Sequence, residues 1–487
     1  MRRKRAIVCV ILVVCLALCG VLYATRPQIP TGGAGENMIY SVVTEPTEAP
    51  PALSESQKVS YERMVRQSVM ELISTGAAQN AVDAARETAA FAARYPGETS
   101  AKGRMMYHSA AALEEILETL ERREDTAVLR QHIAEYQKAY GELTAQEQAG
   151  LPPITESDYH LAQLAAHEKG YRAYDEMVLT FGGDNSFTTN TIADYSTSFG
   201  KLYTRREIGP DTVLHHLLPL TAGDSKTFFC NSQIFSDTIK GTGVYASLNE
   251  RAEVYLGGGV DAVSAANKYS AARGEEGLNS TKAALDALQI EMLGNGSASL
   301  VQDRGASATV LTLNCGSDMP NDESRLASYT GQVKAAKEAG AVIAYVFWDS
   351  GVETTASQKE TARALVDAGA DVVIGCGTER VQGAELYNGA YIFYGVGRLV
   401  WGDNPYLKEG DYSLIVRVKV APIKGESRVR EVSVVPCNLS TSWEAGKNNY
   451  QPTPQFGERA KAILGEVVQK SAALEHGVKE LPHYDIP

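Results

Sequence analysis

The stretch from Gln358 to Val400 constrains the fold more than any other part of the chain. Residues 358–367 carry apolar side chains at the spacing of one helix face, as Ala362 and Leu365 illustrate. After a Gly-Ala-Asp turn, Val372-Val373-Ile374 is a β-branched run too short for a helix, so it predicts a buried strand. A loop and a second strand at 391–394 follow. Because α/β proteins bind ligands where strands end in loops, this stretch also predicts the position of a site.

The same alternation of strands and helices extends from Met177 to the C-terminal region. Residues 414–420 and 429–435 alternate apolar and polar side chains like an antiparallel pair. This order predicts an α/β (α+β) fold, with a layered sheet core flanked by helices. The remaining strands are expected at 177–181, 227–230, 262–265, 309–313 and 342–347, and the remaining helices at 247–255, 275–288, 323–336 and 455–474.

The N-terminus predicts a membrane anchor. Arg2 to Arg5 are all basic, and the run from Ala6 to Ala24 is apolar and uncharged, within the roughly 17 to 25 residues that span a bilayer as a helix. The basic cluster predicts a cytoplasmic N-terminus in a single-pass protein of the cell membrane, with the bulk of the chain extracellular. A cleaved signal peptide is the alternative, although residues 23–28 offer no small-x-small cleavage site. The net charge of −13 argues against binding nucleic acid.

Two further segments precede the α/β part. Residues 25–53 are rich in Pro, Thr, Gly and Glu, which is typical of a flexible linker. Residues 54–175 predict a helical module of four or five helices, a stalk or docking unit with breaks near 95–97, 123–125 and 152–153. The expected division is a basic tail (1–5), a transmembrane anchor (6–24), the linker (25–53), the helical module (54–175), the α/β domain (176–442) and a C-terminal helix with a tail (443–487).

Four cysteines lie outside the expected anchor: Cys230, Cys315, Cys376 and Cys437. Four cysteines allow three pairings, and the sequence does not choose among them. Free buried thiols are an equal alternative to a disulfide.

Residues 358–400 resemble the signature of the CapA family of capsule and poly-γ-glutamate synthesis proteins. The resemblance implies a calcineurin-like metallophosphatase fold over about residues 177–436, in which strand ends present Asp, Glu, Asn and His to metal ions. Where the family has His-His-Pro-His, this chain has Cys376-Gly377-Thr378-Glu379, and Arg398 replaces an Asn. The matching positions are Gln358, Ala362, Leu365, 367–375, Gln382, Glu385, Tyr387, Gly389, Ile392, Tyr394 and Gly397.

The other motifs that the resemblance implies keep their positions but lose ligands. Asp184 ends the first motif, and Asn231 opens the second, where Gln233 replaces a Glu. The third motif keeps Asn267 but has Tyr269 in place of a His. In the fourth, Phe347-Trp348-Asp349 stands where the family has His-Trp-Gly.

The histidines argue against the family's metal centre. None of the eight falls between Leu217 and Glu475, where every histidine motif maps. A two-metal site needs several anionic or imidazole ligands, whereas Asp184 with three amides supplies one carboxylate, and Lys268 adds an opposing charge. We therefore expect no metal cofactor. The alternative is a rebuilt site for one divalent metal ion, formed by Asp184, Asp349, Cys376 and Glu379. No ligand spacing in the sequence requires such a site, and solvated loop residues at strand ends explain these four as well.

By resemblance, we expect an extracellular, non-catalytic protein of a Gram-positive type of cell that helps to make, export or anchor an envelope polymer. Its partner would be polyglutamate, a polysaccharide or the synthesis machinery. A pocket of surviving shape could hold such a polymer. Two alternatives remain: a metal-dependent hydrolase of phosphoester or amide bonds, and a protein whose helical module docks the partner. The pocket residues would be Asp184, Asn185, Asn231, Gln233, Asn267, Lys268, Tyr269, Trp348, Glu379, Gln382 and Arg398.

Overall fold

The described part of the chain, in a computed structural model, is residues 52–483 except 93–94, 96–98, 119–126, 173–175, 190–197, 240–243, 317–318, 320 and 442–445. The apolar run that predicts an anchor, Ala6 to Ala24, and the expected linker up to residue 51 lie outside it. Among the described residues, no helix combines the length and the apolar character needed to cross a membrane.

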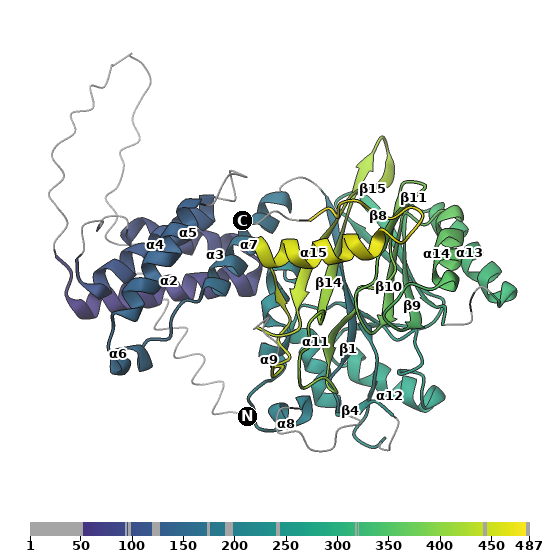
Figure 1. Cartoon of the computed structure of the whole chain (residues 1–487), viewed down its shortest axis with the longest axis horizontal. Coiled ribbons are helices and arrows are strands. Elements are labelled where there is room, and N and C mark those ends of the chain that lie inside the picture. The colour runs from purple at the N-terminus through teal and green to yellow at the C-terminus, as the bar shows by residue number, and fades with distance from the viewer. Residues whose placement is uncertain are drawn as a thin grey trace, which may run out of the picture. The chain divides into compact units, whose positions relative to one another are not determined.

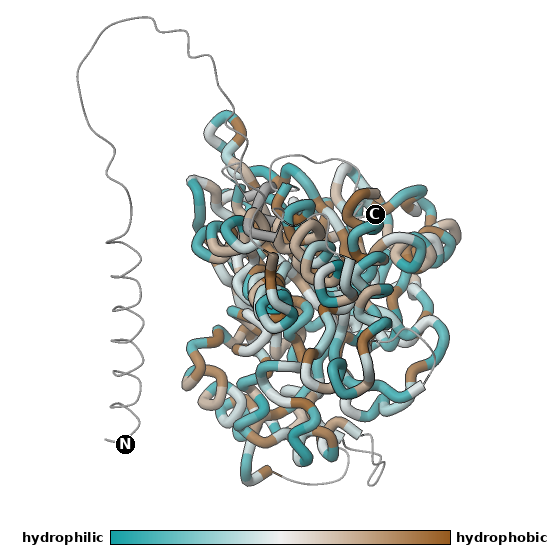
Figure 2. Tube along the Cα trace, turned by 90° about the vertical axis from the view of Figure 1, so that its left-hand side faces the viewer, coloured by the Kyte–Doolittle hydropathy of each residue, from teal (hydrophilic) through white to brown (hydrophobic). Residues whose placement is uncertain are grey.

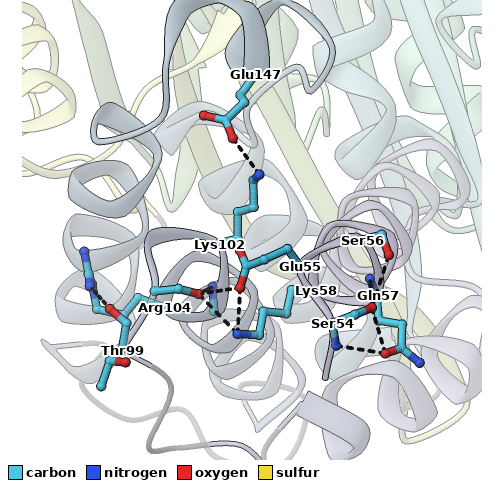
Figure 3. Close-up of polar contacts among 11 residues, drawn as sticks. Ser54, Glu55, Ser56, Gln57, Lys58, Thr99, Lys102, Arg104 and Glu147 are labelled. Carbon is cyan, nitrogen blue, oxygen red and sulfur yellow. Dashed lines mark hydrogen bonds and ion pairs between the residues drawn. The ribbon is translucent and has the colours of Figure 1, made fainter. Parts of the chain in front are cut away.

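Helices fill the N-terminal part, as the sequence predicts. Gly76, in the left-handed conformation with φ 56°, ends the first helix and adds a break that the sequence reading missed. Ser54 and Gln57 close a capping box at the start of α2, and Lys102 of α4 pairs with Glu147 of α6 at 2.5 Å (Figure 3). The helices are α2 (Glu55–Thr75), α3 (Gln79–Ala92), α4 (Ala101–Glu118), α5 (Ala127–Gly141), α6 (Ala145–Ala149) and α7 (Glu156–Arg172).

These helices pack around an apolar core of their own. Val69, Leu113 and Leu161, from α2, α4 and α7, are fully buried in one cluster. Hydrophobic and hydrophilic segments alternate along the helical turns (Figure 2), as expected of amphipathic helices. The helices also contact the α/β part. Leu164 of α7 is buried in an apolar cluster with Phe229 of β2 and Val263 of β5.

The first sheet has eight strands in the order β16-β15-β14-β1-β2-β5-β6, with β13 paired to one end of β1. β1 runs parallel to β2 and β13 and antiparallel to β14. The strands are β1 (Met177–Ser186), β2 (Lys226–Asn231), β5 (Ala262–Ser264), β6 (Glu291–Leu293), β13 (Arg398–Trp401), β14 (Tyr412–Ile423), β15 (Glu426–Asn438) and β16 (Thr453–Pro454).

The second sheet has six strands in the order β11-β12-β10-β9-β8-β7. Its four central strands are parallel, and β7 and β11 pair antiparallel at the edges. The strands are β7 (Ser297–Asp303), β8 (Ala306–Asn314), β9 (Ala341–Ser350), β10 (Val372–Thr378), β11 (Ala384–Tyr387) and β12 (Ala390–Phe393).

The two sheets face each other across a shared apolar core. Successive residues of a strand point to opposite faces of its sheet. Ile343 of β9 therefore packs in the core between the sheets with Phe181 of β1. Its neighbour Val342 packs on the outer face, in a cluster with residues of α13 (Glu323–Lys337) and α14 (Ala356–Asp367). Figure 1 shows α13 and α14 beside β9 and β10, and α15 (Gly457–Ser471) lying across the strands. The first sheet's outer cluster contains Val254 of α11 (Glu253–Gly257) and Leu285 of α12 (Gly274–Asp286). The predicted layered α/β core with flanking helices is therefore confirmed.

The sequence reading did not predict the seven-residue strand β7 (Ser297–Asp303), and its other differences from the structure are in shorter elements. The helix expected over 247–255 is wrong as one element, because the chain passes from β4 (Ala246–Ser247) through a 3-10 turn (Asn249–Ala252) into α11. Several two- to four-residue strands and turns have too few residues to show a period. The further short elements are α8 (Phe199–Thr204), α9 (Pro210–Val213), a 3-10 turn at His215–Leu217, α10 (Leu218–Thr221) and β3 (Ile234–Phe235).

Candidate functional site

Asp184 lies at the centre of the site, near the end of β1, and its side chain is buried. Its carboxylate accepts hydrogen bonds from the Ser232 hydroxyl (2.8 Å), the Cys230 thiol (3.2 Å) and the Gly377 backbone N–H (2.7 Å). Burial raises the pKa of Asp184 above its ordinary value, against the opposing effect of these bonds and of the Arg398 charge. The carboxylate is therefore held by protein donors on both oxygens.

A close backbone approach fixes this arrangement. The Asp184 N–H donates to the Gly397 carbonyl at 3.3 Å, which joins β1 to the turn before β13. A Cβ added to Gly183 would lie 1.8 Å from that carbonyl oxygen, so only glycine fits there. The Gly-Gly-Asp sequence thus serves the packing of β1 against β13.

The three amides that follow the family positions are buried, and each makes at least one hydrogen bond within the protein. Asn267 accepts from the backbone N–H groups of Tyr269 (3.0 Å) and Ser270 (2.9 Å), and donates to the Asn231 carbonyl at 2.8 Å. The side-chain oxygen of Asn231 accepts from the Tyr255 hydroxyl at 3.1 Å, and that of Gln233 accepts from the Phe187 N–H at 2.8 Å. These amides hold the loops after β2 and β5 together.

Charged and aromatic side chains surround the mouth of the site. Lys268 pairs with Asp349 at 2.6 Å, and Arg398 pairs with Glu379 at 3.8 Å. The Arg398 guanidinium also lies over the Trp401 ring, 4.1 Å from its centroid. Each cation therefore has a carboxylate partner.

A cavity of about 260 Å³ opens between these groups and Asp184. Of the residues predicted for the pocket, it brings together Asp184, Lys268, Tyr269, Glu379 and Arg398, with Asp349 beside them. The other predicted residues do not line it. Asn185, Asn231, Gln233, Asn267, Phe347, Trp348, Cys376 and Gln382 are all buried.

One group of potential metal donors lies below the cavity. The donor atoms of Asp184, Cys230 and Cys376 lie within 4.8 Å of one another, and all three residues are buried. Burial raises the pKa of both thiols, so they are protonated at neutral pH. The four cysteines outside the expected anchor are buried and form no disulfide in the described part of the chain, in agreement with the reading as buried thiols.

Comparison with known proteins shows which family the α/β part belongs to. Residues 178–403 match the family described as bacterial capsule synthesis protein PGA_cap. This part of the chain belongs to that family. The predicted CapA-family membership is therefore confirmed.

Two individual proteins are similar to this chain. The PGA biosynthesis protein CapA of Bacillus subtilis (strain 168) is 32% identical over 84 residues, which make up 17% of this chain and only 22% of that relative. The calcineurin-like phosphoesterase YfkN from Bacillus subtilis has 12% sequence identity and a TM-score of 0.31, over 60% of this chain and 97% of that structure.

The donor set of this CapA-family domain does not fit a two-metal centre. Its one buried carboxylate and two protonated thiols would have to lose two protons to bind even one ion. The ion-binding set expected from sequence is only partly assembled: Asp184 and Cys376 lie together, whereas Asp349 and Glu379 pair with cations at the mouth.

The sequence reading missed several residues of the CapA-family site. Cys230 and Ser232 flank Asn231 in the second motif, and both hydrogen-bond Asp184. Trp401 lies three residues beyond Arg398 and joins the cavity wall. In the sequence, only the position of Cys230, immediately before the second motif, indicated that one of these residues would lie at the site.

Proposed function

We propose that this CapA-family chain acts outside the cell, anchored by the apolar run Ala6 to Ala24, in making, exporting or anchoring an envelope polymer, and that it does so without catalysis. One observation carries the proposal. Around the buried Asp184 carboxylate, Tyr269 and Cys376 stand at positions where the family has histidines, and both carboxylate oxygens already accept hydrogen bonds from protein donors. Such a site is suited to holding a polar chain rather than to activating water.

The first test is chemical. We expect the purified full chain to contain far less than one equivalent of any divalent metal and to show no turnover of bis(p-nitrophenyl) phosphate, because Asp184 is already saturated with protein donors. Elemental analysis and an absorbance assay measure both. Metal near one equivalent, with turnover abolished by Asp184→Ala, would contradict the proposal and support a hydrolase built on Asp184, Cys230 and Cys376.

The second test is cellular. Deleting the gene should remove most of the surface polymer, measured chemically on washed cells, and the wild-type gene should restore it. We expect Arg398→Glu to restore several-fold less polymer, because it places a carboxylate beside Glu379 and Asp184. Lys461→Glu is the matched control, on the surface of α15. Unchanged polymer in the deletion strain would refute the polymer role.

A further inference from the structure

The cavity at Asp184 is one end of a longer groove. A second cavity, of about 330 Å³, adjoins it, and the two share Glu379, Arg398 and Trp401 in their walls. The second cavity continues past Tyr245 and Arg380 to Lys408 and Asp411. Both volumes are near the lower end of the roughly 300 to 1,000 Å³ of small-ligand sites. Because the two cavities lie end to end, together they have the elongated form that a short segment of an extended chain needs.

Three aromatic rings meet along this groove. The Tyr245 ring lies 5.3 Å from the Tyr269 ring and 5.1 Å from the Trp401 ring, and Tyr269 lies 5.6 Å from Trp401, centroid to centroid. Tyr245 and Tyr269 are half-buried, so part of each ring faces solvent, whereas Trp401 is buried beneath Arg398. A partly exposed ring with a polar tip offers an apolar face and a hydrogen-bonding group together.

The charges along the groove are paired. Four basic side chains line it, and three of them form ion pairs: Lys268 with Asp349, Arg398 with Glu379, and Arg380 with Asp411 at 3.2 Å. Asp184 and Asp403 add further acidic groups. A polyanion such as polyglutamate would meet no surplus of positive charge, so electrostatic complementarity disfavours it.

We propose that the groove binds a segment of an uncharged glycan chain, an inference that rests on the proposed polymer role and names the polymer's class. Sugar rings present an apolar face of C–H groups, which suits Tyr245 and Tyr269. Their hydroxyl groups both donate and accept hydrogen bonds, so each can bridge an ion pair and make charge-assisted bonds with both partners. A neutral, hydroxyl-rich chain satisfies the groove without breaking its ion pairs.

Isothermal titration calorimetry on the full chain in detergent tests this proposal. The probes are the tetrasaccharides of β-1,4-linked N-acetylglucosamine, β-1,4-linked glucose and α-1,4-linked glucose, with a γ-linked oligoglutamate as the anionic comparison. We expect at least one tetrasaccharide to bind in the micromolar to millimolar range, and the oligoglutamate not to bind. Tyr245→Ala and Arg398→Gln should each weaken glycan binding about tenfold or more. Tyr406→Ala, which removes a ring that is 46% exposed and outside both cavity walls, should leave binding unchanged.

Three outcomes overturn the inference. Oligoglutamate binding without tetrasaccharide binding reverses the polymer class but leaves the polymer role intact. Tetrasaccharide binding that both groove variants leave unchanged, while they remain folded by circular dichroism, places the glycan elsewhere. If none of the probes binds, the groove is not a glycan site. The polymer role is then tested independently by the amount of surface polymer in the deletion strain.

Discussion

Replacing Arg363 by alanine lowers the free energy of unfolding by about 3–5 kcal/mol. Glu385 is fully buried, and its carboxylate accepts two hydrogen bonds from the Arg363 guanidinium, at 3.1 and 2.8 Å, and one from the Tyr394 hydroxyl at 2.8 Å. Without Arg363, the carboxylate of Glu385, which has no exposed surface in the wild type, loses its bidentate cation. Urea denaturation at pH 7, followed by circular dichroism, measures the loss.

The pH dependence of that loss distinguishes the ion pair from simple packing. Burial acts to raise the pKa of Glu385, but the bonds from Arg363, Tyr394 and the His476 N–H outweigh it and lower the pKa. A carboxylate whose pKa is lower in the folded state stabilises the fold above its unfolded pKa, and this stabilisation is lost as pH falls through the folded value. The difference between wild type and Arg363→Ala should therefore shrink in acid.

Lys359→Ala on the same helix is the matched control, because it removes a cation from α14 without touching Glu385. We expect it to change stability by less than about 0.5 kcal/mol. Equal losses from the two variants, or a loss for Arg363→Ala that stays constant with pH, would contradict the account.

The family signature could be recognised from sequence because its residues build local structure. Gln358 accepts from the Thr355 N–H at 2.9 Å to cap α14, and its amide donates to Gln382 at 2.9 Å. Such caps, and the continuous apolar runs of buried strands such as β9 and β10, are short-range patterns. The signature did not reveal what each residue does. Gln382, which the sequence predicted to line the pocket, is buried and donates to the backbone carbonyls of Gly351 and Glu353 instead.

The composition of the site was less predictable, because it depends on which loops meet. Tyr245 and Trp401 are far apart in sequence, yet their rings are in contact. Cys230 reaches Asp184 because the pairing of β1 with β2 shifts register between Phe181 and Asp184. Counting alternate residues along either strand does not reveal such an irregularity.

A second large effect is expected in the helical part, where Glu62→Gln should stabilise the protein at neutral and higher pH. Glu62 of α2 is fully buried, and its carboxyl accepts one hydrogen bond from the Tyr136 hydroxyl, at 2.9 Å. Burial raises the pKa of Glu62 to about 7, against the opposing effect of the Tyr136 bond and of the nearby Arg66 and Arg63 charges. The folded protein thus keeps a proton that the unfolded chain releases near its ordinary pKa of about 4.5.

The sign of the effect follows from that proton. Between pH 4.5 and 7 the folded state binds more protons than the unfolded state, so stability falls as pH rises, by about 1.4 kcal/mol per unit and about 3 kcal/mol in total. Glutamine cannot ionise and keeps the oxygen that accepts from Tyr136, so Glu62→Gln should match wild type near pH 4 and exceed it by about 3 kcal/mol above pH 7. Urea denaturation across this pH range measures the difference.

The control is Glu87→Gln, at an exposed position of α3, whose free energy of unfolding should follow the same pH dependence as that of the wild type. A Glu62→Gln advantage that is absent at pH 8, or equally large at pH 4, would show that Glu62 does not carry this proton.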